Sequence, residues 1–370
     1  MSANIRPSGV FDTSYGQDIS LNRTPFDKVL SNGLFILLLL LPLLAADGPL
    51  GLNIIPQSFI GTIMRISIFA ISVQGLNILV GYTGQISLGH AAFMAVGAYS
   101  GAIFARELGM TFWLALPASA LFTGIIGLVF GLPSLRVKGF YLVMATLAAQ
   151  FIIPWVLRHP LEPLTNGFRP LEVPAPTLFG LSFAHESAMY YVVVPLAVVM
   201  FLAARNLFRT RVGRAFISIR DNDLAAELLG INVFAYKLQA FFISALYAGV
   251  AGCLMAFETN SLTLDSYTLD QSITLLAMLI IGGAGYPLGA LFGVAFVTLL
   301  SQNLIPAIIP FLREILPGLL PFIQEVNIIS SLNPLLFGLA LMIFLILEPR
   351  GLAYRWEILK ISWKIRPFAY

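Results

Sequence analysis

The chain has 370 residues, of which 58% are apolar and only 11% charged, and its formal net charge is +3. Soluble globular domains carry about 25% charged residues, so the charges here are too few to cover the surface of a soluble protein of this length. The composition excludes a soluble fold and indicates that lipid surrounds most of the surface. The single cysteine, Cys253, cannot form an intrachain disulfide, and the three scattered histidines give no metal-binding pattern.

The amino-terminal part begins with a polar tail, residues 1–29, that shows no helical or strand periodicity. The apolar run 34–46 that follows has a length that fits either a signal-peptide core or a short spanning helix. The tail is long for a signal peptide, and Leu44-Ala45-Ala46 matches a cleavage site poorly. We therefore expect a retained first transmembrane helix that begins near residue 30.

Nine further apolar segments follow, and most of them reach the about 20 residues that cross the hydrocarbon layer. They span residues 57–80, 88–105, 112–131, 140–157, 188–205, 235–256, 271–282, 287–306 and 332–348. The sequence thus predicts an all-α, polytopic membrane protein with about ten transmembrane helices, some of them short or broken. The predicted organisation is the tail 1–29, a transmembrane domain 30–348 and a carboxy-terminal tail 349–370.

The basic residues are distributed unevenly over the loops between these segments. If the amino terminus is cytoplasmic, 16 of the 21 Lys and Arg residues fall on the cytoplasmic side, and Arg65 lies within a span. The outer side receives only Arg106, Arg158, Arg169 and Arg313. The positive-inside rule therefore predicts that both termini and the loop 206–234 are cytoplasmic and that the segment 158–187 is external.

The sequence carries no motif for catalysis or nucleotide binding. It lacks a GxxxxGK[ST] phosphate loop, an HExxH helix, a GxSxG turn with partner residues, and paired carboxylates within one span. We therefore expect neither an enzyme nor a cofactor, and transport becomes the default function. An ion-coupled secondary transporter is the alternative, but such proteins are expected to carry ionisable residues inside their spans, which are nearly free of Asp and Glu here.

The loop 206–234 contains the signature of a short helix. Asp221, Asn222 and Asp223 are favourable N-cap residues, and Gly230 suits the position after the helix end. The apolar residues between them share one face of the predicted helix and are Leu224, Ala225, Leu228 and Leu229. A helix of about two turns is not stable alone in water. It is expected to lie either in a groove on a partner or on this protein's own surface or the lipid interface, and the residues alone favour neither alternative.

A second segment, at the junction of the spans 57–80 and 88–105, is rich in glycine and small polar residues. It contains Gly81, Tyr82, Thr83, Gly84, Gln85, Ser87, Gly89 and His90. Glycines let a helix unwind or approach a neighbour closely, and unwound backbone inside a membrane is tolerated only beside protein or a water-filled cavity. The segment is therefore either part of a gate or substrate path, or a tight turn between helices. For His90, a hydrogen-bonded position at a helix end is favoured over a proton relay.

A third segment is the glycine-rich break that follows the short span 271–282. It contains Gly282, Gly283 and Gly285, and Gly285, Gly289 and Gly293 recur at every fourth position. Such a break is typical of a discontinuous helix, and the fourfold spacing fits helix–helix contact. We interpret the repeat as packing and the loop as a structural break.

Four stretches taken together resemble the LivM-type permeases of branched-chain amino acid ABC importers. They are LVGYTGQISLGHAAFMAVGAY at 79–99, LPSLRVKGFYLVMATLAAQ at 132–150, VGRAFISIRDNDLAAELLGINVFAYKLQAFFISALYAGVAGCL at 212–254 and LAMLIIGGAGYPLGALFG at 276–293. The stretches occur in the order of the family, and the resemblance runs from about residue 75 to 350. The segment around Thr165-Asn166-Gly167 is similar to the family's threonine- and glycine-rich stretch but lacks its usual paired glycines.

This resemblance implies that residues 30–348 are a permease domain that forms a translocation path for amino acids at a bacterial inner membrane. Branched-chain amino acids are the first expectation, and urea or other small polar solutes are the alternatives. The implied partners are a related permease in a heterodimer, two cytoplasmic ABC ATPases and an external substrate-binding protein. Residues 220–230, including Arg220 and Glu227, would form the coupling helix that docks onto an ATPase. We further predict that Gly81–His90 and Gly282–Gly285 border the translocation route.

The predicted orientation can be tested by cysteine labelling. In a Cys253→Ala background, a single cysteine in place of Thr210 should react with a membrane-impermeant maleimide only after the cells are opened, because residue 210 lies in the predicted cytoplasmic loop. A single cysteine in place of His185, in the predicted external segment, is the matched control and should react on intact cells. Labelling of position 210 from outside intact cells would contradict the orientation.

Overall fold

The computed structural model describes residues 33, 40–44, 56–134, 140–178, 181–183, 185–307 and 328–365. The chain divides into two compact units, Met1–Ile60 with Arg355–Tyr370, and Gly61–Tyr354. The predicted tail 1–29 and most of the predicted first span lie outside the described residues. In the first unit the described elements are η1 (Leu41–Leu44), the beginning of α3 and most of α16.

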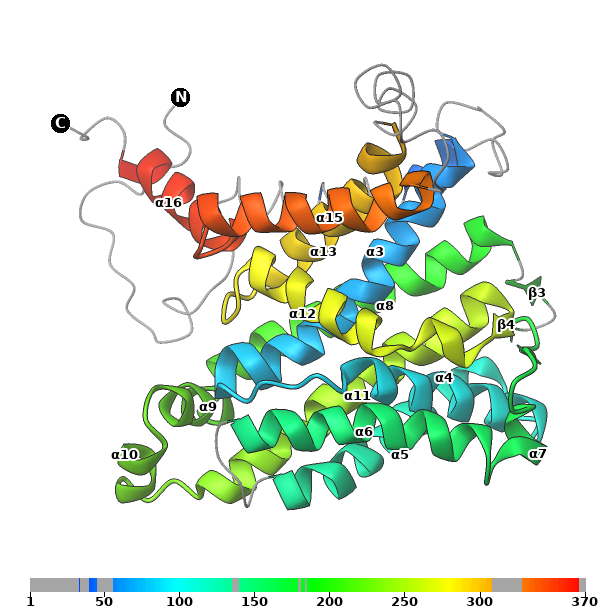
Figure 1. Cartoon of the computed structure of the whole chain (residues 1–370), viewed down its shortest axis with the longest axis horizontal. Helices are drawn as coiled ribbons and strands as arrows, with labels where there is room; N and C mark the ends of the chain where they lie inside the picture. Colours follow the sequence, from blue (N-terminus) through cyan, green and yellow to red (C-terminus); the bar gives the residue numbers. More distant parts are fainter. Residues whose placement is uncertain are drawn as a thin grey trace. The chain divides into compact units, whose positions relative to one another are not determined.

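Helices make up nearly all of the regular structure that is described (Figure 1). Up to the long central connection they are α3 (Gln57–Leu76), the π-helical turn η2 (Asn77–Tyr82), α4 (His90–Arg106), α5 (Phe112–Ser134), α6 (Phe140–Arg158) and α7 (Glu162–Thr165). They continue as α8 (Glu186–Arg209), α9 (Arg211–Asp221), α10 (Asp223–Leu228), α11 (Val233–Thr259), the 3-10 turn η3 (Leu264–Ser266), α12 (Leu269–Gly282), α13 (Gly289–Leu299), the π-helical turn η4 (Leu300–Leu304), α15 (Ile328–Leu347) and α16 (Leu352–Ile365).

The strands are short and lie in the connections. β1 (Leu171–Glu172) pairs antiparallel with β4 (Ser261–Leu262), with Leu171 opposite Leu262. β2 (Thr177–Leu178) pairs antiparallel with β3 (Leu181–Ser182). The first pair joins the predicted external segment 158–187 to the loop that follows α11, so these two connections lie on the same side of the helices.

The predicted all-α membrane class is confirmed. Six of the described helices are long and apolar enough to cross a membrane, or seven if residues 335–347 and 352–362 form one broken span. These six correspond to the predicted spans 57–80, 112–131, 140–157, 188–205, 235–256 and 287–306. The predicted spans 88–105, 271–282 and 332–348 are the helices α4, α12 and α15. Helix α12 has 14 residues, as expected for a short span that ends inside the protein.

Helices α4 and α11 form the core of the second unit, where α4, α5, α6 and α11 run side by side (Figure 1). Glycines set the distance between α4 and α11. A Cβ on Gly97 would overlap the backbone of Gly249, and a Cβ on Gly252 would overlap the carbonyl of Met94. Lipid chains are as apolar as the side chains, so helices in a membrane associate through close packing of this kind.

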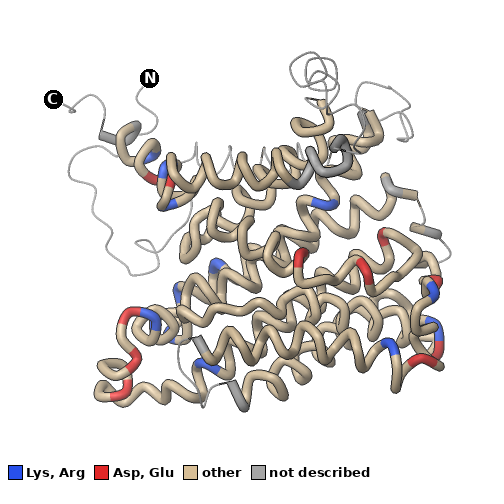
Figure 2. The backbone as a smooth tube through the Cα atoms, viewed as in Figure 1, with Lys and Arg blue, Asp and Glu red and all other residues tan. Residues whose placement is uncertain are grey.

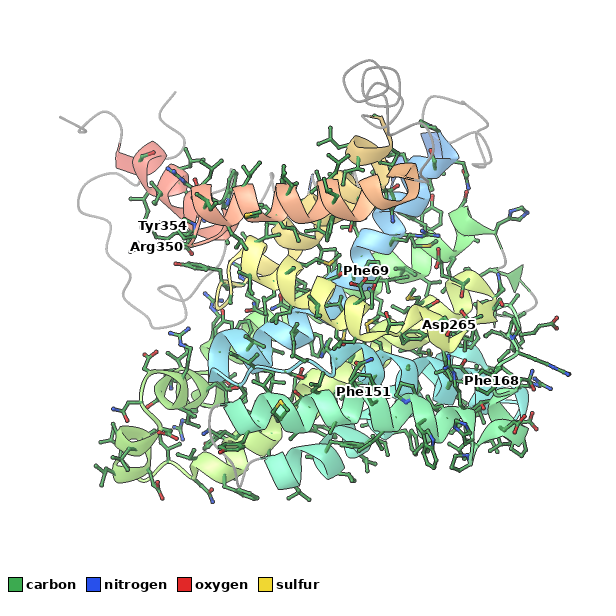
Figure 3. All side chains as sticks on the ribbon, in the orientation of Figure 1. Phe69, Phe151, Phe168, Asp265, Arg350 and Tyr354 are labelled. Atoms are coloured by element: carbon green, nitrogen blue, oxygen red, sulfur yellow. The ribbon has the colours of Figure 1, made fainter. Side chains whose placement is uncertain are left out.

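The outer helices of this unit present their large apolar side chains on exposed faces. Leu121, Ile125 and Val129 lie four residues apart on α5 and are exposed, as are Phe151 and Trp155 on α6 (Figure 3 labels Phe151). In water such faces would be unfavourable, whereas in a membrane they contact lipid chains. The pattern is that of helices which bury small residues inward and direct large ones to the bilayer.

Charged residues of the second unit gather near the ends of these helices, and the stretches between them are mostly uncharged (Figure 2). At one end, Arg158 forms an ion pair with Asp265 of the loop after α11. The basic residue predicted within a span, Arg65, lies 3.6 Å from the carboxylate of Glu258. A charge that enters a membrane span is expected to have such a partner.

The α4–α11 contact predicts which glycines are structurally required. Gly252→Val should destabilise the detergent-solubilised chain by about 1–3 kcal/mol, because the added carbons would overlap the backbone of α4. Gly338→Val on α15 is the matched control, since a Cβ at Gly338 would meet no atom of the described residues within 4 Å. Thermal unfolding should show a lower Tm for Gly252→Val alone, and equal shifts for both variants would refute the packing argument.

Candidate functional site

The first predicted site segment begins where α3 and η2 end. Gly84 adopts φ +70°, a left-handed conformation that stops the helix and favours glycine. The Thr83 hydroxyl donates a hydrogen bond to the Leu79 carbonyl at 2.6 Å, and the N–H of Gln85 donates to the same carbonyl at 3.0 Å. Residues 84–89 are not helical, which agrees with both alternatives expected for this segment, a gate or substrate path and a tight turn.

Residues 84–89 connect the end of η2 to α4 without helical structure. Gln85 and Ser87 are buried, whereas Ile86 between them is 47% exposed, which is the alternation expected of an extended chain. At the end of the segment the buried His90 donates from Nε2 to the carbonyl of Ser72, within α3, at 2.9 Å. The hydrogen-bonded position at a helix end that we predict for His90 is therefore confirmed.

The first N–H groups of α4 lie inside the protein and are satisfied by side chains of α6 and α12. Ser272 Oγ accepts from the N–H of Ala91 at 2.9 Å, and Gln150 Oε1 accepts from the N–H of Ala92 at 3.0 Å. Ser272 also donates to Gln150 Oε1 at 2.8 Å, and Gln150 Nε2 donates to the Tyr267 carbonyl at 2.8 Å. A helix begins with N–H groups that have no helical partner, so these side chains take the place that water has at a surface.

The glycine-rich break between α12 and α13 is also confirmed. Gly282 is the last residue of α12, and Gly283 and Gly285 then adopt φ +105° and +85°. A Cβ on Gly293 would overlap the backbone of Met278 and Gly282 in α12. A Cβ on Gly289 would overlap the carbonyl of Gly283, the residue after α12. Gly289 and Gly293 therefore make the predicted helix contact, whereas Gly285 lies in the loop and not in that contact.

The structure brings the two glycine-rich segments together through Asn77 of η2. Asn77 Nδ2 donates to the Tyr286 carbonyl at 2.9 Å, and Asn77 Oδ1 accepts from the N–H of Gly285 at 2.8 Å. Gly81 approaches so closely that a Cβ on it would overlap the nitrogen of Gly285. One side-chain amide thus holds the α12–α13 loop against the end of the α3–η2 helix.

Helix α9 meets the same place. Arg220 Nη1 donates to the Gly81 carbonyl at 3.0 Å. The neighbouring Tyr82 stacks on Phe208 of α8, with ring centroids 3.4 Å apart and planes inclined by 8°. All three segments singled out from the sequence therefore meet at one end of the second unit. We refer to the four residues that connect them as the polar hub, which consists of Asn77, Gly81, Arg220 and Gly285.

The short helix predicted after Asp221 is confirmed as α10 (Asp223–Leu228). Asn222 is its N-cap, with Oδ1 accepting from the N–H of Ala225 at 3.0 Å. Gly230 adopts φ +83°, and the N–H groups of Gly230 and Ile231 return to carbonyls of the last turn. This is a Schellman ending, in which glycine takes the left-handed position.

The apolar face of α10 is not covered by the described part of the chain. The exposed fractions are 62%, 83% and 80% for Leu224, Leu228 and Leu229. Ala225, Glu227 and Asp221 are also exposed. The helix is attached on its other side, by the buried Ala226 and by the Asp223–Lys237 ion pair of 3.5 Å. Figure 1 shows α10 beside α9, at the end of α11.

The hub contains no group that suggests catalysis. Its side chains are one guanidinium and one amide, and its other members contribute backbone atoms. Among the described residues, no group of three His, Cys, Asp or Glu side chains could hold a metal ion. The arrangement connects three structural elements.

The opposite end of the second unit carries a different set of side chains. Arg158 pairs with Asp265 and lies over the ring of Phe168, with Cζ 4.9 Å from the ring centroid. Asp265 and Phe168 are labelled in Figure 3. In the Thr165-Asn166-Gly167 segment, Asn166 and Gly167 both adopt positive φ. A cavity of about 660 Å³ lies beside this turn and is lined by Ala105, Arg106, Asn166, Pro170, Glu172, Val173 and Pro174.

Helix α9 and the partners that hold the unwound segment were not predicted from the sequence. Helix α9 buries Ala215, Phe216 and Ile219, and this spacing of three and four is a signal that could have identified it. Asn77 and Gln150 gave no such signal, because a single amide in an apolar span does not indicate which distant backbone group it binds.

Comparisons with known proteins agree on a permease family. A sequence profile described as branched-chain amino acid transport system / permease component matches residues 58–346. The high-affinity branched-chain amino acid transport system permease proteins LivM of Escherichia coli and Salmonella typhimurium are each 33% identical over 242 residues, which is 59% of this chain and 57% of each relative. The guanosine ABC transporter permease protein NupQ of Bacillus subtilis is 25% identical over 252 residues, 63% of this chain and 77% of NupQ. No solved structure shows a significant match.

Two buried glutamines should respond differently to the same substitution. Gln150→Leu removes the acceptor for the N–H of Ala92 and for Ser272, and each buried polar group left without a partner costs about 1–3 kcal/mol. Gln74→Leu is the matched control, since Gln74 is equally buried but neither of its amide atoms has a partner among the described residues. Thermal unfolding in detergent should show a lower Tm for Gln150→Leu and an unchanged or higher one for Gln74→Leu. A similar loss in both variants would show that the hydrogen bonds of Gln150 are not what matters.

Proposed function

Because this chain belongs to the family of branched-chain amino acid transport permeases, we propose that it is the membrane-spanning permease subunit of an ABC importer. It forms the translocation path together with a related permease, and two cytoplasmic ABC ATPases and an external substrate-binding protein complete the assembly. The chain itself is non-catalytic in this proposal, and ATP is hydrolysed on the ATPase subunits. The observation that carries the proposal is the exposed leucine face of α10.

Helix α10 has only six residues, which is too short for stability by itself in water. Its caps, its buried Ala226 and its ion pair through Asp223 hold it in place without using the leucines. Fully burying one Leu contributes about 1.5–3 kcal/mol, so the three exposed leucines offer a substantial interaction to a protein groove. An anionic lipid surface suits this turn less well, because Glu227 is exposed beside Leu228.

The proposal assigns sides and a path to the chain. Both termini and the loop 206–234 are cytoplasmic, and the segment 158–187 is external and faces the binding protein. Gly81–His90 and Gly282–Gly285 border the translocation route within the permease domain 30–348. Two findings support this assignment: the hub and α10 lie at one end of the second unit, and the uneven distribution of Lys and Arg favours the cytoplasm for that end.

The proposed cargo is an amino acid, with branched-chain amino acids first, on the strength of the two relatives at 33% identity. The family also includes a permease named for guanosine, so membership by itself does not fix the solute. In an importer of this kind, selectivity is expected to reside largely in the external binding protein. Identifying the ligand carried by the co-purified binding protein therefore tests the cargo directly.

The docking role of α10 predicts the effect of placing a charge on its leucine face. Leu228→Asp and Leu224→Asp should weaken ATPase binding by about tenfold or more. Burying one Leu in the interface contributes about 1.5–3 kcal/mol, and each variant replaces that Leu with a charge that would have to be desolvated. ATP-driven uptake in reconstituted vesicles should fall in parallel, while the membrane helices remain folded. Co-purification of the ATPase subunits and uptake of the cargo are the two measurements.

The matched control carries the same change at the other end of the second unit. Leu108 is 60% exposed in the connection between α4 and α5, so Leu108→Asp should leave ATPase binding unchanged. Full ATPase binding and full uptake in both α10 variants would mean that the leucine face is not the docking surface.

A further inference from the structure

Arg220 stands apart from the other residues of the predicted coupling segment. It is near the end of α9, and its guanidinium binds Gly81 of the polar hub. Nη1 donates to the Gly81 carbonyl at 3.0 Å, while Nε and Nη2 donate to Asp221 Oδ1 at 3.1 and 3.0 Å. Each of the three guanidinium nitrogens therefore has an acceptor within this chain.

Glycines surround this side chain on two sides. A Cβ on Gly84 would lie 3.2 Å from Arg220 Cγ, and a Cβ on Gly285 would lie 3.0 Å from Arg220 Nη1. Both glycines also adopt positive φ, which other residues rarely do. The unwound segment and the α12–α13 loop thus leave a space that the Arg220 side chain fills.

The carbonyl that Arg220 binds lies at a helix end. Gly81 is in the last turn of η2, where carbonyls have no helical partner and the helix dipole is negative. A guanidinium satisfies such a carbonyl with a charge-assisted hydrogen bond, which is stronger than a neutral one. Arg220 therefore caps the helix from which the unwound segment 84–89 departs.

Arg220 is also closely connected to α10. Helix α9 ends at Asp221 and α10 begins at Asp223, so only Asn222 separates them. Asn222 donates its N–H to Ser218 of α9 at 3.1 Å and caps α10 with its side chain. A displacement of α10 would therefore reach the Gly81 carbonyl through a short and well-connected path.

We propose that Arg220 is a positioning residue that transmits the displacement of α10 to the unwound segment 84–89 and, through Asn77, to the α12–α13 loop. This inference rests on the proposed importer function, and it separates two roles within one segment. The leucines bind the ATPase, and Arg220 passes the motion on to the membrane part. Loss of Arg220 should uncouple the complex without dissociating it.

The test uses the complete importer in vesicles and measures ATPase retention, ATP hydrolysis and solute uptake. Arg220→Met keeps an unbranched stem over Gly84 and removes the donor to Gly81. We expect full ATPase retention, continued hydrolysis and a fall of about tenfold or more in solute transported per ATP, as expected from losing one charge-assisted hydrogen bond. Arg220→Lys, which keeps the charge and a single donor nitrogen, should restore part of this ratio.

Arg214→Met on the same helix is the matched control. Arg214 is exposed, and its side chain donates to the carbonyl of Arg209, the last residue of α8, at 3.3 Å. Arg214→Met should therefore keep the wild-type amount of solute transported per ATP. A wild-type ratio in Arg220→Met would overturn the proposal, and so would loss of the ATPase from that variant, since Arg220 would then act in docking.

If Arg220→Met is not recovered from the membrane, Arg220→Lys and Asn77→Asp decide the question. Asn77→Asp keeps the acceptor for Gly285 and loses the donor to Tyr286, so its ratio should also fall. Wild-type ratios in both variants would overturn the proposal. If the wild-type protein neither binds the ATPase nor supports uptake, the importer function itself is contradicted. That outcome differs from a failure of Arg220 to transmit motion, in which the wild type is active and Arg220→Met keeps the wild-type ratio.

Discussion

The structure depends on one constraint, which is that every backbone N–H and C=O that leaves a helix within lipid needs a partner from the protein. The unwound segment 84–89 creates several such groups at once. The Thr146 hydroxyl accepts from the N–H of Leu88 at 3.0 Å, and Gln150 and Ser272 satisfy the beginning of α4. These bonds connect α4 to α6 and α12, so satisfying the break also fixes the arrangement of the surrounding helices.

Close packing supplies the second condition, because polar partners reach the break only if the helices lie near one another. The absence of a Cβ at Gly97 and Gly252 lets α4 approach α11 to backbone contact. The same absence at Gly81 and Gly285 lets the end of η2 meet the α12–α13 loop, where Asn77 can bind it. Glycine therefore has two uses in this chain, namely helix contact in the core and unusual backbone conformation at the hub.

Family membership explains the general task of the chain but does not say how its parts share that task. The contacts of individual residues do so. Leu228 and its neighbours are exposed on α10 and have no cover in the described part of the chain, whereas Arg220, only a few positions earlier, is engaged with Gly81. A segment that reads as one motif in the sequence is divided in space into an exposed apolar face on α10 and a connection to the membrane helices.

The sequence by itself determined the membrane class, the positions of nine helices, the unwinding at Gly84 and the short helix α10, because these follow from local composition, capping and hydropathy. The predicted tail 1–29 and most of the predicted first span lie outside the described part of the chain. Only the tertiary structure decided that Asn77 binds the loop at Gly285 and that Gln150 and Ser272 hold the beginning of α4. Each of these contacts joins residues far apart in the chain, and a lone amide or hydroxyl in an apolar span carries no local sign of its partner. The partner is set by how closely glycines allow the helices to pack, which is a property of the assembled fold.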